Sequence, residues 1–187
     1  MTTITPSLLK HILAGYSLPP LGVHGITHWA RVLENGRRLA QHVDADPIVL
    51  EFFAIFHDAR RQNEAIDHGH GRRGFHLACA LRGAAFELDD ARFALLEQAC
   101  NEHTSGLTQA DVSVQVCWDA DRLDLMRVGI RPAPIYLCTE AAREAAVLEW
   151  ANQRAIQRCV PDLIREEWGL DLAKLKQNGT PEGRGLA

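Results

Sequence analysis

Apolar residues recur at helical spacing along most of the chain, with polar residues on the opposite face of each segment. In residues 26–43, for example, Ile26, Trp29 and Leu33 fall on one face of a helix. Residues 47–59 are apolar nearly all round, which is typical of a buried central helix. The predicted helices cover residues 6–14, 26–43, 47–59, 72–86, 89–103, 114–128 and 139–168.

Three stretches interrupt this helical pattern. Residues 60–71 are polar and end in a glycine-flanked histidine, so we predict a loop that contains His70. Residues 112–116 alternate as a strand would, but the helical face that follows favours a helix. Pro161 is a candidate break in the last long helix. No hairpin turn joins alternating segments, so the sequence predicts an all-α fold.

Length and composition indicate one domain. The 187 residues are 47% hydrophobic and 24% charged, as in an ordinary globular protein. We expect a single helical domain over residues 1–177, with C-terminal helices in 139–177 and a flexible tail over 178–187. The formal net charge of −4 lacks the basic excess of a nucleic-acid-binding protein, so no nucleic-acid partner is expected.

The cysteines and the start of the chain bear on its location. The five cysteines contain no CxxC pair and are odd in number, which is typical of reduced thiols. Residues 1–6 lack a basic region followed by an apolar core, and no apolar run approaches the roughly 20 residues of a membrane span. We therefore expect a cytoplasmic protein without a membrane partner.

The candidate chemistry begins at Phe56-His57-Asp58, where a histidine and an aspartate close an apolar run. Burying an imidazole and a carboxylate is costly unless both are paired or bound to a metal. His28 and Asp121, on other predicted helices, can complete a set of four ligands. Imidazole and carboxylate without thiolate suit a divalent cation such as Mn, Fe, Ni, Zn or Mg.

The order His28, His57-Asp58 and Asp121 resembles the HD superfamily of metal-dependent phosphohydrolases. His28-Trp29-Ala30-Arg31-Val32 is similar to the family's first motif, Phe56-His57-Asp58 to its namesake dyad, and residues 119–124 to its closing motif. The resemblance spans residues 24–128 and implies an HD-domain helical bundle, a divalent cation and hydrolysis of a phosphate ester. Ala59-Arg60-Arg61 after the dyad departs from the cyclic-dinucleotide branch.

Several neighbouring residues leave alternatives open. Asp119 competes with Asp121 as the last ligand, because two positions apart on a helix they cannot both reach one ion; the motif favours Asp121. His70 and His103 could build a second metal site or orient phosphate and protonate the leaving group. His24 and Arg61 are further candidates for substrate contact, Arg61 because arginine clamps phosphate.

These features together favour an enzyme in which metal-activated water attacks a small phosphate ester, with a nucleotide as the favoured partner. Two alternatives remain: a metal- and nucleotide-binding signalling module without turnover, and an HD-type di-iron oxygenase. The sequence leaves metal identity, substrate and a homodimeric state open.

Overall fold

The computed structural model describes residues 3–178, and within that range every regular element is a helix. An isolated bridge between Arg82 and Phe86 is the single β-type pairing among the described residues. The all-α prediction is therefore confirmed. The α-helices are α1 (Pro6–Ala14), α2 (Ile26–Leu39), α3 (Pro47–Phe56), α4 (His70–Leu81), α5 (Asp90–Glu102), α6 (Val112–Arg122), α7 (Glu140–Arg143), α8 (Ala145–Ile156), α9 (Leu163–Glu166) and α10 (Leu172–Asn178). Two short 3₁₀ helices, η1 (Leu125–Val128) and η2 (Pro134–Tyr136), follow α6.

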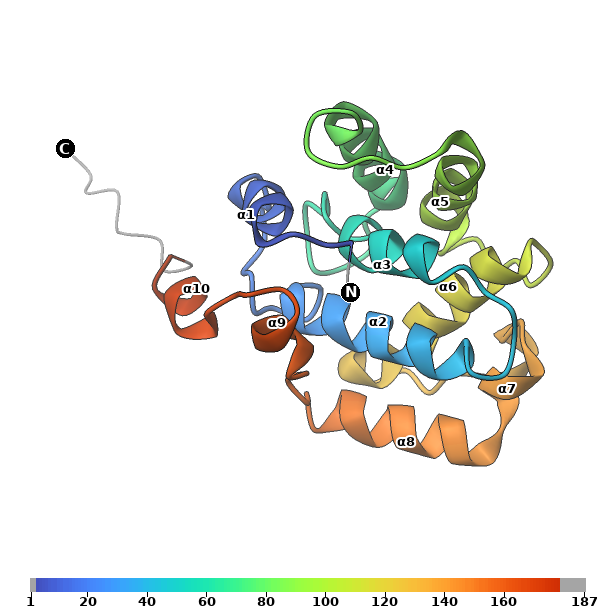
Figure 1. The fold of residues 1–187 in the computed structure, drawn as a ribbon. Helices are drawn as coiled ribbons and strands as arrows, with labels where there is room; N and C mark the ends of the chain where they lie inside the picture. Colours follow the sequence, from blue (N-terminus) through green and yellow to red (C-terminus); the bar gives the residue numbers. More distant parts are fainter. Residues whose placement is uncertain (1–2, 179–187) are drawn as a thin grey trace.

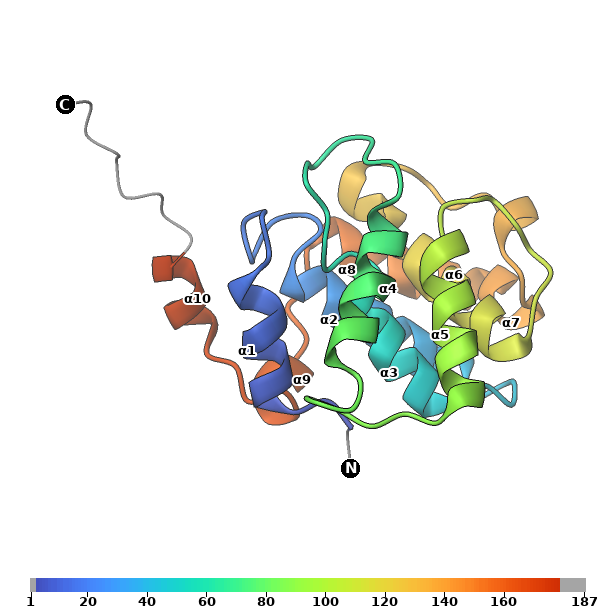
Figure 2. The ribbon, with the colours of Figure 1, turned by 90° about the horizontal axis from the view of Figure 1, so that it is seen from above.

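Helices α2, α3 and α6 form the centre of the molecule and pack against one another. Helices α4 and α5 pair on one side of α3, and α8 runs on the other side of α2 (Figure 1). Seen from above, α1 and α10 lie together at one end of the molecule (Figure 2). Each of the three central helices contributes residues to the site described below.

Helix α3 is almost entirely buried, as its apolar sequence predicts. The Asp46 side chain accepts hydrogen bonds from the backbone N–H groups of Ile48 and Val49, and Pro47 occupies the first turn. Every residue from Val49 to Phe56 is buried. The helix ends at Phe56 rather than at residue 59 as predicted, so Asp58 lies in the turn that follows.

The boundaries of three other helices differ from the prediction. Helix α6 ends at Arg122 rather than at residue 128, and η1 follows it. Helix α2 ends at Leu39, earlier than residue 43. Helix α4 begins at His70, not at residue 72, and ends at Leu81 instead of residue 86. His70 is therefore helical, and its predicted position in a loop is wrong. The reason is Gly69, whose positive φ of 75° turns the chain directly into α4.

The long helix predicted over residues 139–168 is interrupted twice. The candidate break at Pro161 falls between α8 and α9, whereas the break at residue 144 was not predicted. The segment is divided into α7, α8 and α9, because Glu144 has extended backbone angles and Arg158 has a left-handed φ of 50°. The strand-like alternation after Asp111 is helical, with the Asp111 side chain accepting from Ser113 N at the start of α6. Except for residue 178, which ends α10, the predicted tail lies outside the described residues.

Two glycines set the position of α4. A Cβ atom at Gly71 would lie 2.0 Å from the Cys100 carbonyl oxygen in α5. At Gly74 it would lie 2.0 Å from the Phe56 carbonyl oxygen at the end of α3. Only glycine permits such backbone contact. Helix α4 therefore lies directly against both neighbours, and this packing brings His70 close to the ends of α3 and α5.

All five cysteines are unpaired in the structure, and three of them, Cys100, Cys117 and Cys138, are buried. Among the described residues, no helix has the length and apolar character needed to cross a membrane.

Candidate metal centre

The four residues expected to bind a metal converge in the interior from three helices and one turn. His28 lies in α2, His57 caps the end of α3, Asp58 follows it, and Asp121 lies in α6. His28 and His57 are fully buried, and both carboxylates are nearly so. These helices bury most of their residues against one another, so the polar side chains on their buried faces lie together in the interior.

Their ligand atoms lie close to one another. The two Nε2 atoms of His28 and His57 are 3.1 Å apart. His28 Nε2 is 3.4 Å from Asp121 Oδ1 and 3.6 Å from Asp58 Oδ2. Within the described residues, Asp121 Oδ1 is buried and has no hydrogen-bond partner. A buried carboxylate oxygen without a donor is costly, so this atom fits the coordination shell of a cation.

The partners of the other ring nitrogens determine where the imidazole protons lie. His28 Nδ1 is 2.7 Å from Asp124 Oδ2, and His57 Nδ1 is 3.1 Å from the carbonyl oxygens of Phe53 and Ala54. These oxygens only accept hydrogen bonds, so each Nδ1 carries the proton and each neutral ring has its lone pair on Nε2. Two imidazole lone pairs therefore point at two carboxylates with no proton between them, which is the donor set of a metal site.

His70 and His103 form a second set on the other side of Asp58. Their Nδ1 atoms lie 2.6 Å and 2.8 Å from the carbonyl oxygens of Asp67 and Cys100, which turns each Nε2 toward Asp58. The two Nε2 atoms are 2.8 Å apart. Asp58 Oδ1 is 3.1 Å from His70 Nε2 and 4.0 Å from His103 Nε2. Asp58 thus offers one oxygen to each set, and each set could hold a metal ion.

Burial and the neighbouring charges set the ionisation of the cluster. Burial lowers the pKa of His57 to about 3 and also lowers the pKa of His103, so both rings are neutral. Burial opposes ionisation of Asp58, but His57 and hydrogen bonds from His24 and His70 hold its pKa well below its usual range. The pKa of His70 is raised despite burial, because Asp58 accepts its proton.

His24 precedes α2 and also faces Asp58. Its Nδ1 is 2.8 Å from Asp58 Oδ2, and its Nε2 is 3.8 Å from Glu64 Oε2. Together with His28 and Asp58 it forms a third group that could hold a metal. Unlike the other four histidines, it presents Nδ1 rather than Nε2 to the cluster. It therefore fits a hydrogen-bond donor to Asp58.

Asp119 and Asp121 point in different directions. Asp119 accepts hydrogen bonds from Cys138 N at 2.7 Å, from Thr139 N at 2.8 Å and from the Thr139 hydroxyl at 2.8 Å. It anchors the segment that enters α7 and lies outside the cluster. Asp121 is the aspartate that reaches His28 and His57.

Sequence reasoning missed Asp124 and its two arginines. Asp124 accepts from Arg31 through both oxygens, at 2.7 Å and 3.0 Å, in addition to holding His28. Arg127 donates to the Val23 carbonyl oxygen at 2.9 Å, and its NH2 is 3.9 Å from Asp121 Oδ1. The available signal was spacing, since Asp124 follows Asp121 by three positions and Arg31 follows His28 by three.

A cavity of about 370 Å³ gives access to the cluster. His24, Asp58, His103 and Asp121 line its inner part. Arg61 also lines it, is buried, and has its NH1 3.5 Å from Asp58 Oδ1. The cavity therefore combines a metal-ligand set with basic side chains.

Comparisons with protein-family models, with curated proteins and with solved structures find no match for this chain.

Proposed function

We propose that this chain is a metal-dependent phosphohydrolase of the HD type, with His28, His57, Asp58 and Asp121 as metal ligands. The observation that carries the proposal is the buried Asp121 Oδ1, which lacks a hydrogen-bond donor in the described part of the chain and faces two proton-free imidazole nitrogens. Such a donor set favours a hard or borderline divalent cation such as Mn, Fe, Ni, Zn or Mg.

A divalent cation held there would supply an acidic bound water, with its pKa lowered from 15.7 towards about 7. The residues of the chain would bind the phosphate and position it for attack. Arg61 and Arg127, which line the cavity, would hold the phosphate oxygens by charge-assisted hydrogen bonds. Water would attack phosphorus as the ester P–O bond breaks. The leaving oxygen would take up the proton that the attacking water loses, and His24, which lines the same cavity, would contact the substrate.

The size and lining of the cavity support a small phosphate ester, with a nucleotide as the favoured substrate. Its volume of about 370 Å³ is near the lower end for ligand pockets. Ile66, Val128 and Ile130 line it and are exposed, at 80%, 40% and 55%. This apolar rim would pack against a flat apolar group such as a nucleobase.

The test is a panel of phosphomonoesters, phosphodiesters and nucleotides, assayed with Mn, Mg, Co and Ni. We expect turnover that requires a metal and that Asp58→Asn reduces to background. Asp44→Asn is the matched control, because Asp44 is exposed, belongs to none of the ligand groups and does not line the cavity. Metal-loaded wild-type protein that is inert on every ester would refute the proposal, and tight nucleotide binding without turnover would favour the signalling module.

A di-iron oxygenase is a second candidate, and the set of Asp58, His70 and His103 beside the first set favours it. Iron-loaded protein that consumes oxygen with an organic substrate, while hydrolysing no phosphate ester, would support this alternative.

A further inference from the structure

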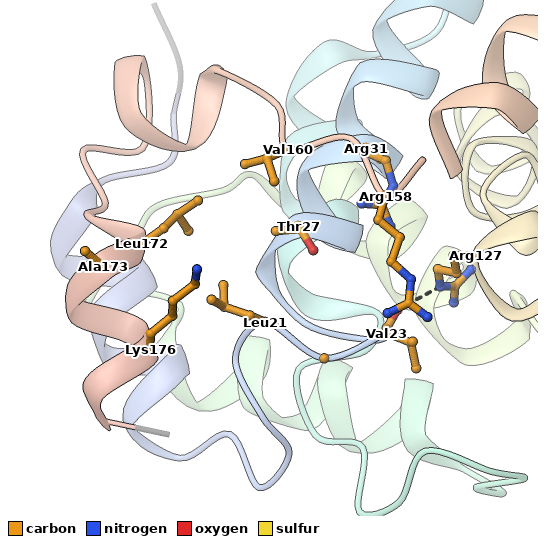
Figure 3. A pocket seen from close by; sticks show the side chains of 11 residues that line it. Leu21, Val23, Thr27, Arg31, Arg127, Arg158, Val160, Leu172, Ala173 and Lys176 are labelled. Carbon is orange, nitrogen blue, oxygen red and sulfur yellow. Dashed lines mark hydrogen bonds between the residues drawn. The ribbon is translucent and has the colours of Figure 1, made fainter. Parts of the chain in front are cut away.

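A second cavity, of about 310 Å³, shares Arg127 with the 370 Å³ cavity at the metal-ligand cluster, called here the metal-side cavity. Figure 3 shows three arginines on one side of it and α10 on the other. Its lining contains four basic side chains, Arg31, Arg127, Arg158 and Lys176, and no acidic side chain. The remainder of the lining is mostly apolar, with Leu21, Val23, Val160, Leu172 and Ala173.

Arg158 occupies a backbone position that favours glycine. It follows α8, where Arg158 N donates to Ala155 O and Cys159 N donates to Arg154 O, the two bonds of a Schellman motif. Its φ is 50°, and it is the sole non-glycine residue with positive φ in residues 3–178. Arginine is strained there, because a Cβ atom disfavours the left-handed region. A strained residue of this kind points to a role for the side chain.

The Arg158 side chain has no hydrogen-bond or ion-pair partner among the residues that the structure describes. Lys176 likewise has none in that range. Arg31 and Arg127 differ, because both are buried and both contact Asp124, which offsets part of their charge. The uncompensated positive charge at this cavity therefore resides mainly on Arg158 and Lys176.

The start of α2 adds to this positive field. Gly25 gives the helix no side-chain cap, and Thr27 in the first turn lines the cavity. The N-terminal end of a helix carries partial positive charge. The guanidinium groups of Arg31 and Arg127 also line this cavity. Arg127 is held by the hydrogen bond that it donates to the Val23 carbonyl oxygen (Figure 3).

We infer that this cavity binds a small organic anion, with a phosphate or carboxylate head near Arg158 and Lys176 and a short apolar body against Leu21, Val160 and Leu172. The charge of the lining selects an anion. The apolar walls require a body that a free inorganic ion lacks, and the volume limits its length. The inference does not depend on the proposed function, since Arg158 does not line the metal-side cavity.

Calorimetric titration of the EDTA-treated, metal-free protein with hexyl phosphate and with hexanoate tests this inference, because without a metal the phosphate ester cannot be bound by the metal or turned over in the other cavity. We expect saturable binding of at least one anion, and the comparison identifies the preferred head. 1-Hexanol and hexylamine should bind much more weakly. Arg158→Gly and Arg158→Gln should each weaken binding about tenfold, the effect of losing one charged hydrogen bond. Arg158→Gly should also keep or raise the thermal midpoint, because glycine relieves the strained backbone.

Arg165→Gln is the matched control, because Arg165 is an exposed arginine of α9 that does not line this cavity. Its variant should bind the anions as the wild type does. Unchanged affinity in both Arg158 variants would overturn the inference, as would hexylamine binding as tightly as the anions or no detectable binding of either anion. The thermal midpoint of Arg158→Gly separates a lost site from a misfolded protein.

Discussion

Asp124 determines the orientation of the His28 ring. Its Oδ2 lies 2.7 Å from His28 Nδ1, while Arg31 donates to both of its oxygens. Arg31 therefore holds the carboxylate in the position in which it accepts the hydrogen bond from His28 Nδ1. Its pKa is lowered although burial opposes ionisation, because His28 and Arg31 stabilise the charged form. Such partners keep the metal-facing nitrogen free and raise its basicity.

We expect Asp124→Asn to lower metal affinity by about 10–100-fold, because the amide cannot hold the His28 proton as the carboxylate does. Metal titration of the purified variant measures this change. Asp44→Asn, at an exposed position, is the control and should bind metal normally. An Asp124→Asn protein that is folded and binds metal as tightly as the wild type would rule out this role.

The neutral state of His57 makes the metal-free protein sensitive to acid. Burial lowers its pKa to about 3, whereas the unfolded chain has a pKa near 6.5. Between these values the unfolded state binds one more proton, so the free energy of unfolding should fall by about 1.4 kcal/mol per pH unit as pH drops. His103 acts in the same direction. The raised pKa of His70 matters only above about pH 6.5, where its contribution is lost as pH rises.

Urea unfolding of the metal-free protein at a series of pH values from 7 to 4 measures this slope. His57→Gln should reduce it by about one proton, and His42→Gln, which changes an exposed histidine, should leave it unchanged. Equal slopes in the wild type and His57→Gln would contradict the assignment.

At the scale of single residues, the sequence revealed the candidate metal ligands but not the residues that hold those ligands in position. His57 and Asp58 stood out because an apolar run leads into them. Asp124 and Arg31 did not, because a charged residue in an amphipathic helix is usually solvated and nothing local distinguishes a buried one. The motif favoured Asp121 over Asp119 as a ligand. The different role of Asp119, which holds residues 138–139, could not be read from the sequence.

At the scale of elements, α4 is placed by backbone contact. Gly71 and Gly74 lie on the face that meets α5 and the end of α3. This contact sets the depth of His70, the first residue of α4, relative to His103, which caps α5. The second ligand set therefore depends on two residues that have no side chain.

Gly74→Ala should destabilise the fold by about 1–3 kcal/mol, since the new Cβ would meet the Phe56 carbonyl oxygen and force the helices apart. Gly36→Ala is the matched control in α2, because its Cβ would have ordinary contacts at 3.6 Å. That variant should be neutral or more stable by about 0.5–1 kcal/mol. Chemical denaturation compares the two, and equal stability of both variants would contradict the packing argument.

Helix boundaries were predictable where a cap and an apolar face coincide, as at both ends of α1 and at the start of α3. They were not predictable where tertiary contacts decide them. The division between α7 and α8 comes from the extended backbone at Glu144, where the sequence reads as continuous helix. The early start of α4 depends on the left-handed Gly69, which sequence reasoning assigned to a loop.

At the scale of the whole molecule, the ligand set joins segments that are distant in sequence. Residues 28, 57 and 121 lie on or at the end of the central helices, and Asp58 lies in the turn after α3. These three helices pack against one another in the core. An ion that binds them only in the folded state would stabilise the entire domain. All-α architecture followed from periodicity, but this convergence followed only from the order of motifs that resemble a known family.

Removal of bound metal by a chelator should lower the thermal midpoint by about 5–10 °C, because metal at one hundred times its Kd contributes about 2.7 kcal/mol. Thermal unfolding with and without EDTA, followed by addition of Mn, measures the effect. Asp121→Asn should show little response to either treatment. A wild-type midpoint that is indifferent to chelator and metal would speak against a resident ion.

Arg127 lines both cavities, one against the ligand cluster and one against the α10 face. Two ligands that share one side chain are thermodynamically linked. If an anion on the α10 side alters the affinity for a metal-side ligand by some factor, that ligand must alter the anion's affinity by the same factor. Because both ligands would contact Arg127, this reciprocity could act through that one side chain. Binding at the two cavities would then be coupled, and the coupling free energy would depend largely on Arg127.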